Sequence, residues 1–310
     1  MVHRMKTIGD KLEAFSVTRH SPHVARRAPA LLARALTIAG SDSGGGAGIQ
    51  ADLKTFSAFR VYGMSVLTAV TAQNTVGVQG VETLSPAFIT AQFESVVSDI
   101  GLDALKIGML GTAAVVVAVA TMIAKAGLTN LVVDPVMVAK SGDHLLAENA
   151  VHALRTRLLP LALVITPNLP EAEALVGGPI RTLYEMREAA RRLHALGPHW
   201  VVIKGGHGGG DTVTDLLYDG QTFDRLDGAR IDTPHTHGTG CTFSAAMTAC
   251  LARGKTVPEA FAAAKQYTHA AIVAAPGLGH GHGPLNHLVS PWDESNRVKN
   301  AEDAEGLCHD

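Results

Sequence analysis

The sequence is poor in aromatic residues and in cysteine, and both shortages argue against particular classes of protein. Aromatic side chains make up 5% of the 310 residues, which disfavours the base-stacking platforms of single-strand-binding proteins. The three cysteines, Cys241, Cys250 and Cys308, include no C-x-x-C pair and are too few for a disulfide framework. We therefore expect a protein of a reducing compartment, and specifically of the cytoplasm.

Long hydrophobic runs and a strong net charge are also missing. The longest apolar stretch, residues 113–120, is far shorter than the run of about 18 residues that indicates a membrane-spanning helix. A net charge of -2 gives no general attraction to nucleic acid or to anionic membranes. Neither is expected as a partner. The 46% of hydrophobic residues is ample for a large buried core.

The two ends of the chain differ from its middle. Residues 1–33 mix basic and acidic side chains and have no apolar segment followed by a small-residue cleavage site, so a flexible extension is favoured over a targeting peptide. Residues 291–310 are polar and acidic and are expected to form a tail. Residues 34–290 contain no linker or repeat and are predicted to form one domain.

Within that domain, short apolar runs alternate with amphipathic or Ala-rich stretches, which predicts an α/β fold with a mostly parallel sheet flanked by helices. Strands are expected at residues 36–40, 65–70, 104–109, 130–136, 163–167 and 200–204. Helices are expected at 49–59, 86–100, 113–126, 145–159 and 183–196. A β-meander at 214–219 and 222–231 and two helices at 240–252 and 257–274 complete the prediction.

Glycines and polar residues gather where these strands end. They occupy residues 40–46, 73–75, 108–110, 134–136, 167–168 and 204–207. Open α/β sheets bind their ligands beyond the carboxyl ends of the strands. The site is therefore predicted at this edge of the sheet.

The strongest local motif is His237-Gly-Thr-Gly-Cys241, which leads into an Ala-rich helix. Small residues allow successive backbone N–H groups to converge at a helix N-terminus, which favours phosphate binding. Cys241 lies in the first turn, where the positive end of the helix favours a thiolate. It could accept the proton of an attacking alcohol or simply stabilise the alcohol. A tight loop before a helix with a small buried cysteine is the structural alternative.

Residues 43–48 are glycine-rich but match neither common nucleotide motif. The run lacks the Gly-Lys-Ser/Thr ending of a P-loop, and Ile49 stands where a dinucleotide-binding fold requires glycine or alanine. A structural loop and a lid over a small substrate both remain open. The histidine pairs His235/His237 and His280/His282 lack further ligands for zinc and are interpreted as loop histidines.

Three polar positions each have a structural and a functional interpretation. Asn168 and Glu171 have the spacing of a capping box, with Pro170 in the first turn, but could also lie near a hydrated Mg²⁺. Lys204 ends a buried-looking strand and needs a partner or an anion, such as a phosphate. The side-chain amide of Gln73 could pair with a ring nitrogen and an adjacent amino group of a heteroaromatic ligand, or it could bond only to the backbone.

Eight segments together carry a family resemblance. They are residues 36–42, 45–56, 72–75, 106–110, 139–143, 166–171, 204–207 and 236–241. In their order and spacing they resemble the hydroxymethylpyrimidine/phosphomethylpyrimidine kinases of thiamine biosynthesis, within the ribokinase-like superfamily. The resemblance covers about residues 36–288 and implies a three-layer α/β/α fold.

The resemblance also implies roles for individual residues. It makes Cys241 the catalytic base beside an anion hole formed by the amides of Gly238, Thr239 and Gly240. It places the pyrimidine against Gln73, in a pocket shaped by Gly40, Asp52, Met109 and Val136. It assigns nucleotide phosphates and metal to Lys204, Asn168, Glu171, Asp134 and Lys140, with Glu171 and Asn168 holding Mg²⁺ through water.

The implied activity is ATP-dependent phosphorylation of 4-amino-5-hydroxymethyl-2-methylpyrimidine and then of its monophosphate, with ATP and Mg²⁺ as cofactors and a homodimer as the assembly. Two alternatives stay open. One is a pyridoxal/pyridoxine kinase, which performs the same chemistry on a pyridine ring. The other is a non-catalytic protein that retains only the pyrimidine pocket.

Overall fold

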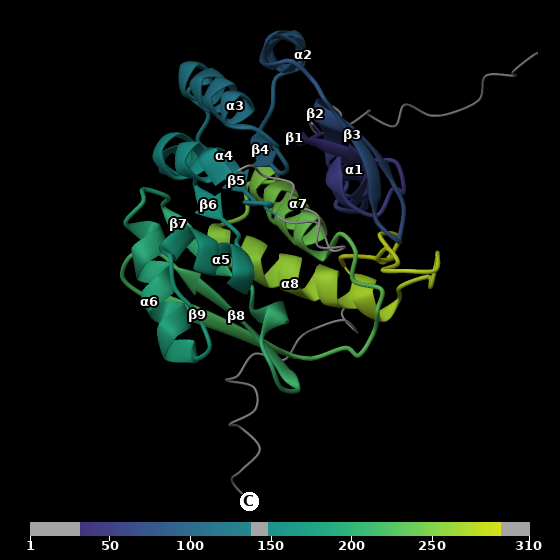
Figure 1. Ribbon diagram of the computed structural model, residues 1–310, viewed down its shortest axis with the longest axis vertical. Coiled ribbons are helices and arrows are strands. Elements are labelled where there is room, and N and C mark those ends of the chain that lie inside the picture. The colour runs from purple at the N-terminus through teal and green to yellow at the C-terminus, as the bar shows by residue number, and fades with distance from the viewer. Residues whose placement is uncertain (1–31, 138–147, 293–310) are drawn as a thin grey trace, which may run out of the picture. The chain divides into compact units, whose positions relative to one another are not determined.

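The computed structural model describes residues 32–137 and 148–292 (Figure 1). These residues form a nine-stranded sheet in the order β3-β2-β1-β4-β5-β6-β7-β8-β9. The strands are β1 (Arg34–Asp42), β2 (Tyr62–Gln73), β3 (Val78–Thr83), β4 (Ala104–Ile107), β5 (Leu131–Val133), β6 (Val164–Ile165), β7 (Trp200–Ile203), β8 (Thr212–Tyr218) and β9 (Phe223–Ala229). Every predicted strand is present, although several are shorter than expected.

The sheet is parallel from β2 through β7 and antiparallel at both edges. The strand β3 pairs antiparallel with β2, and β8 and β9 extend the other edge from β7 in the same way. The strand β3 escaped the sequence prediction because its side chains are mostly exposed and it has no apolar run.

Side chains on successive residues of the central strands pack on opposite faces of the sheet. On β1, Leu36 and Ile38 join one hydrophobic core and Ala35 joins the other. On β5, Val132 separates Leu131 and Val133 in the same manner. This period of two is what a strand buried on both faces requires, and it produces the predicted three layers.

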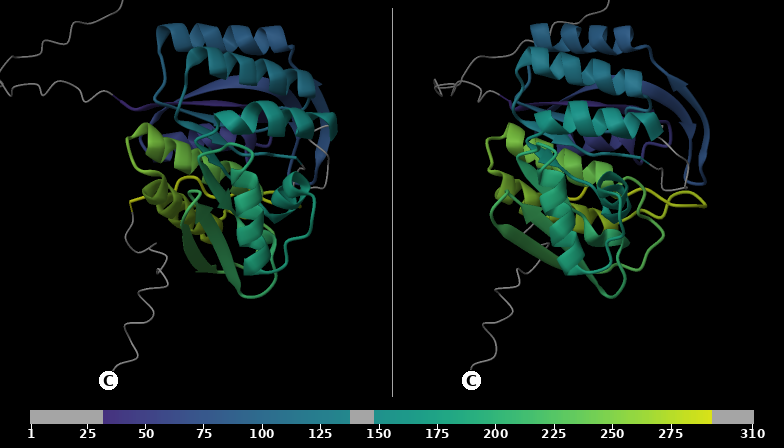
Figure 2. Two further views of the ribbon diagram at one scale, coloured as in Figure 1. Left: turned by 90° about the vertical axis from the view of Figure 1, so that its left-hand side faces the viewer. Right: turned by 60° about the vertical axis from the view of Figure 1, so that its left-hand side comes forward.

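The helices divide between the two faces (Figures 1 and 2). One core is covered by α1 (Gly48–Ala58), α7 (Thr239–Ala252) and α8 (Val257–Val273). The other is covered by α2 (Pro86–Asp99), α3 (Ala113–Ala126), α4 (Glu148–Ala153), α5 (Leu169–Val176) and α6 (Leu183–His194). The helix predicted at 145–159 changes after α4 into a π-helical turn and then a 3-10 turn containing Pro160, whose missing N–H cannot continue an α-helix.

Capping explains where several helices begin. Asn168 and Glu171 form the predicted capping box of α5, and Thr256 and Glu259 form another at α8. The helix α7 differs, because its N-cap is Gly238, which has no side chain to accept from the first-turn amides. No helix in the described ranges is both long and apolar enough to span a bilayer.

Candidate active site

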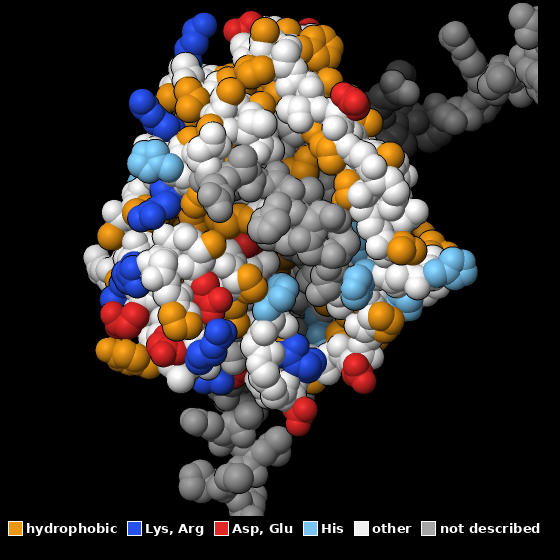
Figure 3. All heavy atoms as spheres, viewed as in Figure 1, with side chains coloured by type: hydrophobic (Ala, Val, Ile, Leu, Met, Phe, Trp, Pro, Cys, Tyr) orange, Lys and Arg blue, Asp and Glu red, His pale blue; other side chains and the backbone are white. Residues whose placement is uncertain are grey.

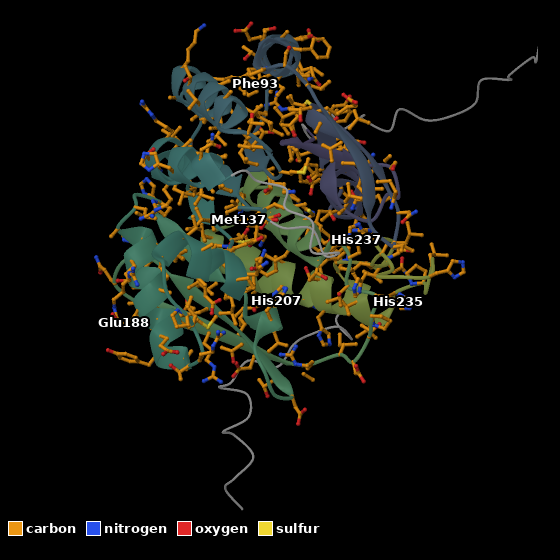
Figure 4. All side chains as sticks on the ribbon, in the orientation of Figure 1. Phe93, Met137, Glu188, His207, His235 and His237 are labelled. Carbon is orange, nitrogen blue, oxygen red and sulfur yellow. The ribbon has the colours of Figure 1, made fainter. Side chains whose placement is uncertain are left out.

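A cavity of about 680 Å³ opens beyond the carboxyl ends of the parallel strands, as the sheet topology predicts. Its walls come from the loops after β1, β2, β4, β5, β6 and β7 and from α7 and α8. Figure 4 labels three residues that line it from different loops, Met137, His207 and His237. On the same face, Figure 3 shows several histidine side chains gathered.

Most of the predicted site residues line this one cavity. They are Gly40, Gln73, Met109, Asp134, Val136, Asn168, Glu171, Lys204, Gly238, Thr239, Gly240 and Cys241. Lys140 lies outside the described residues. Asp52 is the exception, because it does not line the cavity.

Asp52 is fully buried on α1 and forms an ion pair beneath the cavity. Its carboxylate lies 2.7 and 2.8 Å from Nζ of Lys106, and Thr37 Oγ1 donates to it at 2.6 Å. Lys106 extends from β4 and reaches the cavity wall. Asp52 therefore contacts the cavity wall through Lys106, and its role in shaping the substrate pocket stays a prediction. Lys106 was not singled out from the sequence.

The Gly-Thr-Gly segment starts α7 with a close backbone contact. Gly238 has φ +85°, and a Cβ added there would lie 1.8 Å from the carbonyl oxygen of Gly46, so only glycine fits. The amide of Thr239 donates to Thr236 O at 3.3 Å, which reduces its use in an anion hole. The amides of Gly238, Gly240 and Cys241 are the remaining candidates at this helix end.

Cys241 is in the first turn of α7, as predicted, but its thiol is not held as a thiolate. Burial raises its pKa to about 11, although Lys106 and a hydrogen bond from the Gly48 amide lower it. The helix N-terminus was expected to favour the thiolate, and desolvation outweighs that effect. In the ligand-free protein the group facing the cavity is therefore a thiol at neutral pH.

Lys204 and Asp134 form a buried ion pair directly under Gly240. The Lys204 ammonium lies 3.0 Å from Asp134 Oδ1, and a Cβ added at Gly240 would be 3.2 Å from that ammonium. Ser244 Oγ and Thr166 Oγ1 donate to the same carboxylate, each at 3.2 Å. Burial opposes the charge on Lys204, yet its neighbouring carboxylates raise its pKa above the ordinary value.

Glu171 is the second carboxyl group of this cluster. Its Oε2 accepts from the backbone N–H of Asn168 at 2.9 Å, and Asn168 Oδ1 accepts from the Glu171 amide at 2.9 Å. Burial raises the pKa of Glu171 to about 7, opposed by the attraction of Lys204 and reinforced by the repulsion of Asp134. Asn168 and Glu171 thus cap the N-terminus of α5 and are also the two residues predicted to hold Mg²⁺ through water.

Gln73 is held by Thr71 and lies beside His237 at the other end of the cavity. Its Oε1 accepts from Thr71 Oγ1 at 3.1 Å, and its Nε2 lies 3.5 Å from Nε2 of His237. His237 in turn lies 2.9 Å from Asp42 Oδ2. His237 was interpreted as a loop histidine, and the structure places it in the cavity wall beside the predicted ring-binding amide.

Asp42 organises the glycine-rich loop that follows β1. Its carboxylate accepts from the amides of Gly44, Gly46 and Ala47 at 2.8 to 3.0 Å. Burial alone would raise its pKa, but the hydrogen bonds from His237 and these amides lower the pKa below the usual range. Asp42 therefore joins the loop after β1 to the start of the anion-binding segment. Its position directly before the glycine run was the available signal in the sequence.

A family model described as phosphomethylpyrimidine kinase matches residues 42–286, well over half of the chain. The hydroxymethylpyrimidine/phosphomethylpyrimidine kinase of Rhizobium meliloti is 52% identical over 267 residues, covering 85% of this chain and 100% of that protein. The chain belongs to the phosphomethylpyrimidine kinase family.

Other members and neighbours of the phosphomethylpyrimidine kinase family agree with this placement. The thiamine biosynthesis bifunctional protein ThiED of Geobacter sulfurreducens is 52% identical over 88% of this chain, which spans only 56% of that longer protein. The solved phosphomethylpyrimidine kinase of Clostridium difficile has a TM-score of 0.69, with 44% identity over 76% of this chain and 97% of that one. The ADP complex of Bacillus subtilis pyridoxal kinase has a TM-score of 0.78, with 48% identity over 83% and 97%.

Proposed function

We propose that this chain phosphorylates 4-amino-5-hydroxymethyl-2-methylpyrimidine and then its monophosphate, with ATP as the phosphoryl donor, in thiamine biosynthesis. One observation carries the proposal. The start of α7 connects two unlike parts of a single cavity, because His237 lies beside Gln73 and Gly240 lies beside Lys204. Membership of the phosphomethylpyrimidine kinase family and the ADP bound by the related Bacillus subtilis enzyme support the same assignment.

The two ends of the cavity differ in chemistry. The end near β1, β2 and β4 offers the Gln73 amide, with Gly40 and Met109 in contact with each other. The end near β8, β9 and α8 is lined by Val213, Ala229, Ile231, Thr268 and Ile272, among others. We assign the pyrimidine to the first and the nucleotide base to the second, so that the transferred phosphate passes α7.

The residues at the start of α7, where the two ends of the cavity meet, have different roles. Amides at the start of α7 stabilise the negative charge that develops on the phosphoryl group. Lys204, held by Asp134, supplies a fixed positive charge beside them. Cys241 takes the proton of the attacking hydroxyl group or donates a hydrogen bond to it. In a loose phosphoryl transfer, positioning and charge compensation supply most of the catalysis.

The charges in the cluster leave a place for Mg²⁺. With Asp134, Glu171 and Lys204 all ionised, the net charge of the cluster is negative. Burial is the main cause of the raised pKa of Glu171, and the repulsion of Asp134 adds to it. The described residues contain no group of three or more His, Cys, Asp or Glu side chains that could hold a metal by themselves. Glu171 and Asn168 would thus share the ion with phosphates and water, as Mg²⁺ commonly requires. The bound ion would neutralise phosphate charge.

The direct test is ATP consumption by the purified protein, with the pyrimidine alcohol and pyridoxine assayed side by side. We expect the pyrimidine to be the better substrate and two phosphates to be added in sequence. Preferred turnover of pyridoxine would replace the proposal with a pyridoxine kinase. Binding of the pyrimidine without ATP consumption would instead identify a non-catalytic binding protein.

Gln73→Leu should raise KM for the pyrimidine by about 10- to 100-fold, the cost of losing a two-point contact with a ring edge. KM for pyridoxine should change much less, because a pyridine ring lacks the adjacent amino group. Steady-state kinetics on both substrates measure the difference. Gln79→Leu is the matched control, since Gln79 is an exposed glutamine on β3 that bonds only to Gly77 O among the described residues. Equal losses on both substrates would remove the assigned role of Gln73.

Glu171→Gln should abolish a pH dependence that the wild type shows. The pKa of Glu171 is raised to about 7, so the carboxyl group is neutral below that pH and ionised above it. Affinity for Mg-nucleotide should therefore increase in the wild type as pH rises through 7, and remain flat and weaker in the variant. KM for ATP measured across this range tests the point. Glu173→Gln, on the same helix, should keep the wild-type profile.

The assembly and the compartment belong to the same proposal. A homodimer is expected, as the family resemblance implies. A cytoplasmic location suits the free thiols of Cys241 and Cys250.

A further inference from the structure

Arg230 directly follows β9, and its side chain binds the loop that joins β7 to β8. Its Nε donates to Gly210 O at 2.7 Å, its Nη1 to Gly206 O at 2.9 Å and its Nη2 to Gly208 O at 2.7 Å. Its backbone N–H also donates to Asp211 O at 2.7 Å. One guanidinium group therefore binds the carbonyl oxygens of three alternate residues in a single loop.

The loop at residues 205–211 is rich in glycine, and Arg230 binds three of its carbonyl groups. Five of its seven residues are glycine, the residue that loses most backbone freedom when it is ordered. It is held at its start, where the Gly205 amide donates to Asp215 Oδ1 at 2.8 Å and Gly208 N bonds to Gly205 O. Beyond Gly208, Arg230 supplies most of the hydrogen bonds in the described structure that define its path.

The direction of these carbonyls matters for the cavity. In a planar trans peptide the C=O and the following N–H point in opposite directions. With the carbonyls of Gly206 and Gly208 directed at Arg230, the amides of His207 and Gly209 point away from it. Gly206, His207 and Arg230 all line the cavity, and the first two follow shortly after Lys204 in the sequence. The guanidinium thus sets the direction of polar groups in this part of the wall.

We propose that Arg230 is a positioning residue for nucleotide binding: it folds the loop at 205–211 into the conformation that meets the nucleotide beside Lys204. The inference rests on the proposed function, in which this end of the cavity takes the nucleotide. A planar fork of N–H donors is required, because three carbonyls must be bound together and a lysine ammonium is a single point charge. Arg230 acts through the loop and not on the reacting atoms.

The test compares Arg230→Ala with Arg225→Ala. Arg225 lies on the exposed side of β9 and pairs with Asp227, so its loss controls for removal of an arginine from the same hairpin. We expect Arg230→Ala to raise KM for ATP by about 10- to 100-fold, the range for lost hydrogen bonds to a charged group. KM for the pyrimidine and kcat at saturating ATP should stay within about twofold, and Arg225→Ala should match the wild type.

Two further measurements separate positioning from simple destabilisation. Added guanidinium ion at millimolar concentration should restore much of the ATP affinity of Arg230→Ala, whereas Arg230→Lys should remain impaired. Amide hydrogen exchange of residues 205–211 should accelerate in Arg230→Ala and slow again with guanidinium. Unchanged KM for ATP, or equal losses in both KM values with no rescue, would overturn the proposal.

Nucleotide binding can also be measured without turnover. Titration of the wild type and Arg230→Ala with a non-hydrolysable ATP analogue, followed by calorimetry, should show the same loss of affinity. If the wild type bound the analogue but turned over no pyrimidine, the proposed reaction would fail while the role of Arg230 could still be demonstrated. Equal affinity of both proteins would reject the role of Arg230 and leave the reaction intact.

Discussion

Gly238→Ala should reduce kcat by about 100- to 1000-fold, the range seen when one donor of an anion hole is lost. The residue has φ +85°, and a Cβ at this position would lie 1.8 Å from the carbonyl oxygen of Gly46. The oxygen is backbone and the position of a Cβ is fixed by the backbone, so the clash cannot be relieved by rotating a side chain. The start of α7 must shift, and its amides then no longer converge on the phosphate. Single-turnover kinetics with saturating ATP measure the effect.

Gly254→Ala is the matched control for that substitution. Gly254 follows the other end of α7 with φ +79° and has nothing within 4 Å of an added Cβ. Alanine at this position therefore has a similarly unfavourable positive φ but no steric clash with a neighbouring atom. Both variants should lose some thermal stability, and only Gly238→Ala should lose turnover. Comparable activity in the two variants would show that the contact with Gly46 is irrelevant to catalysis.

Cys241→Ala should lower kcat by about 100- to 10,000-fold while leaving ATP binding intact, the range for removal of a general acid or base. The thiol lines the cavity, and its pKa is raised to about 11 by burial. A base with that pKa is ionised in only a small fraction of molecules at neutral pH. Wild-type kcat should therefore increase as the pH rises above 7, and this rise should be absent from the alanine variant.

The shape of that profile distinguishes the two roles left open for the thiol. If Cys241 only donates a hydrogen bond to the alcohol, kcat should not increase with pH, and Cys241→Ser should retain much of the activity. Cys250→Ala is the control, since Cys250 is buried on the same helix and does not line the cavity. Wild-type turnover by Cys241→Ala would exclude both roles.

Most helices and strands could be predicted from the sequence because local patterns of residues determine where they form. Alternating apolar runs and Ala-rich helices identified the parallel strands, and the capping box at Asn168 located the start of α5. The edge strand β3 was missed because an exposed strand has no apolar run. The end of the helix near Leu158 was misplaced because propensity does not reveal a π-helical turn before Pro160.

The residues that line the cavity could be predicted where a residue type suggests its chemistry by itself, and not where it depends on a distant partner. The glycines before Cys241 and the lysine at a strand end line the cavity as predicted, while their catalytic roles stay predictions. The burial that keeps Cys241 a thiol arises from packing that no motif records. The pairing of Asp52 with Lys106 joins residues 54 positions apart, and that of Asp42 with His237 joins residues 195 apart. Such pairs become visible only when the chain is folded.

The carboxylate of Asp42 has a consequence for how this sequence can diverge. It holds three amides of one loop and the imidazole at the start of another, so a single residue sets the register between two segments nearly two hundred positions apart. An insertion or deletion in either segment would have to be matched in the other to be tolerated. The hairpin of β8 and β9 has no such constraint toward the loop after β1. Evolutionary drift in length should therefore accumulate in the turn between β8 and β9 and spare the two loops joined by Asp42.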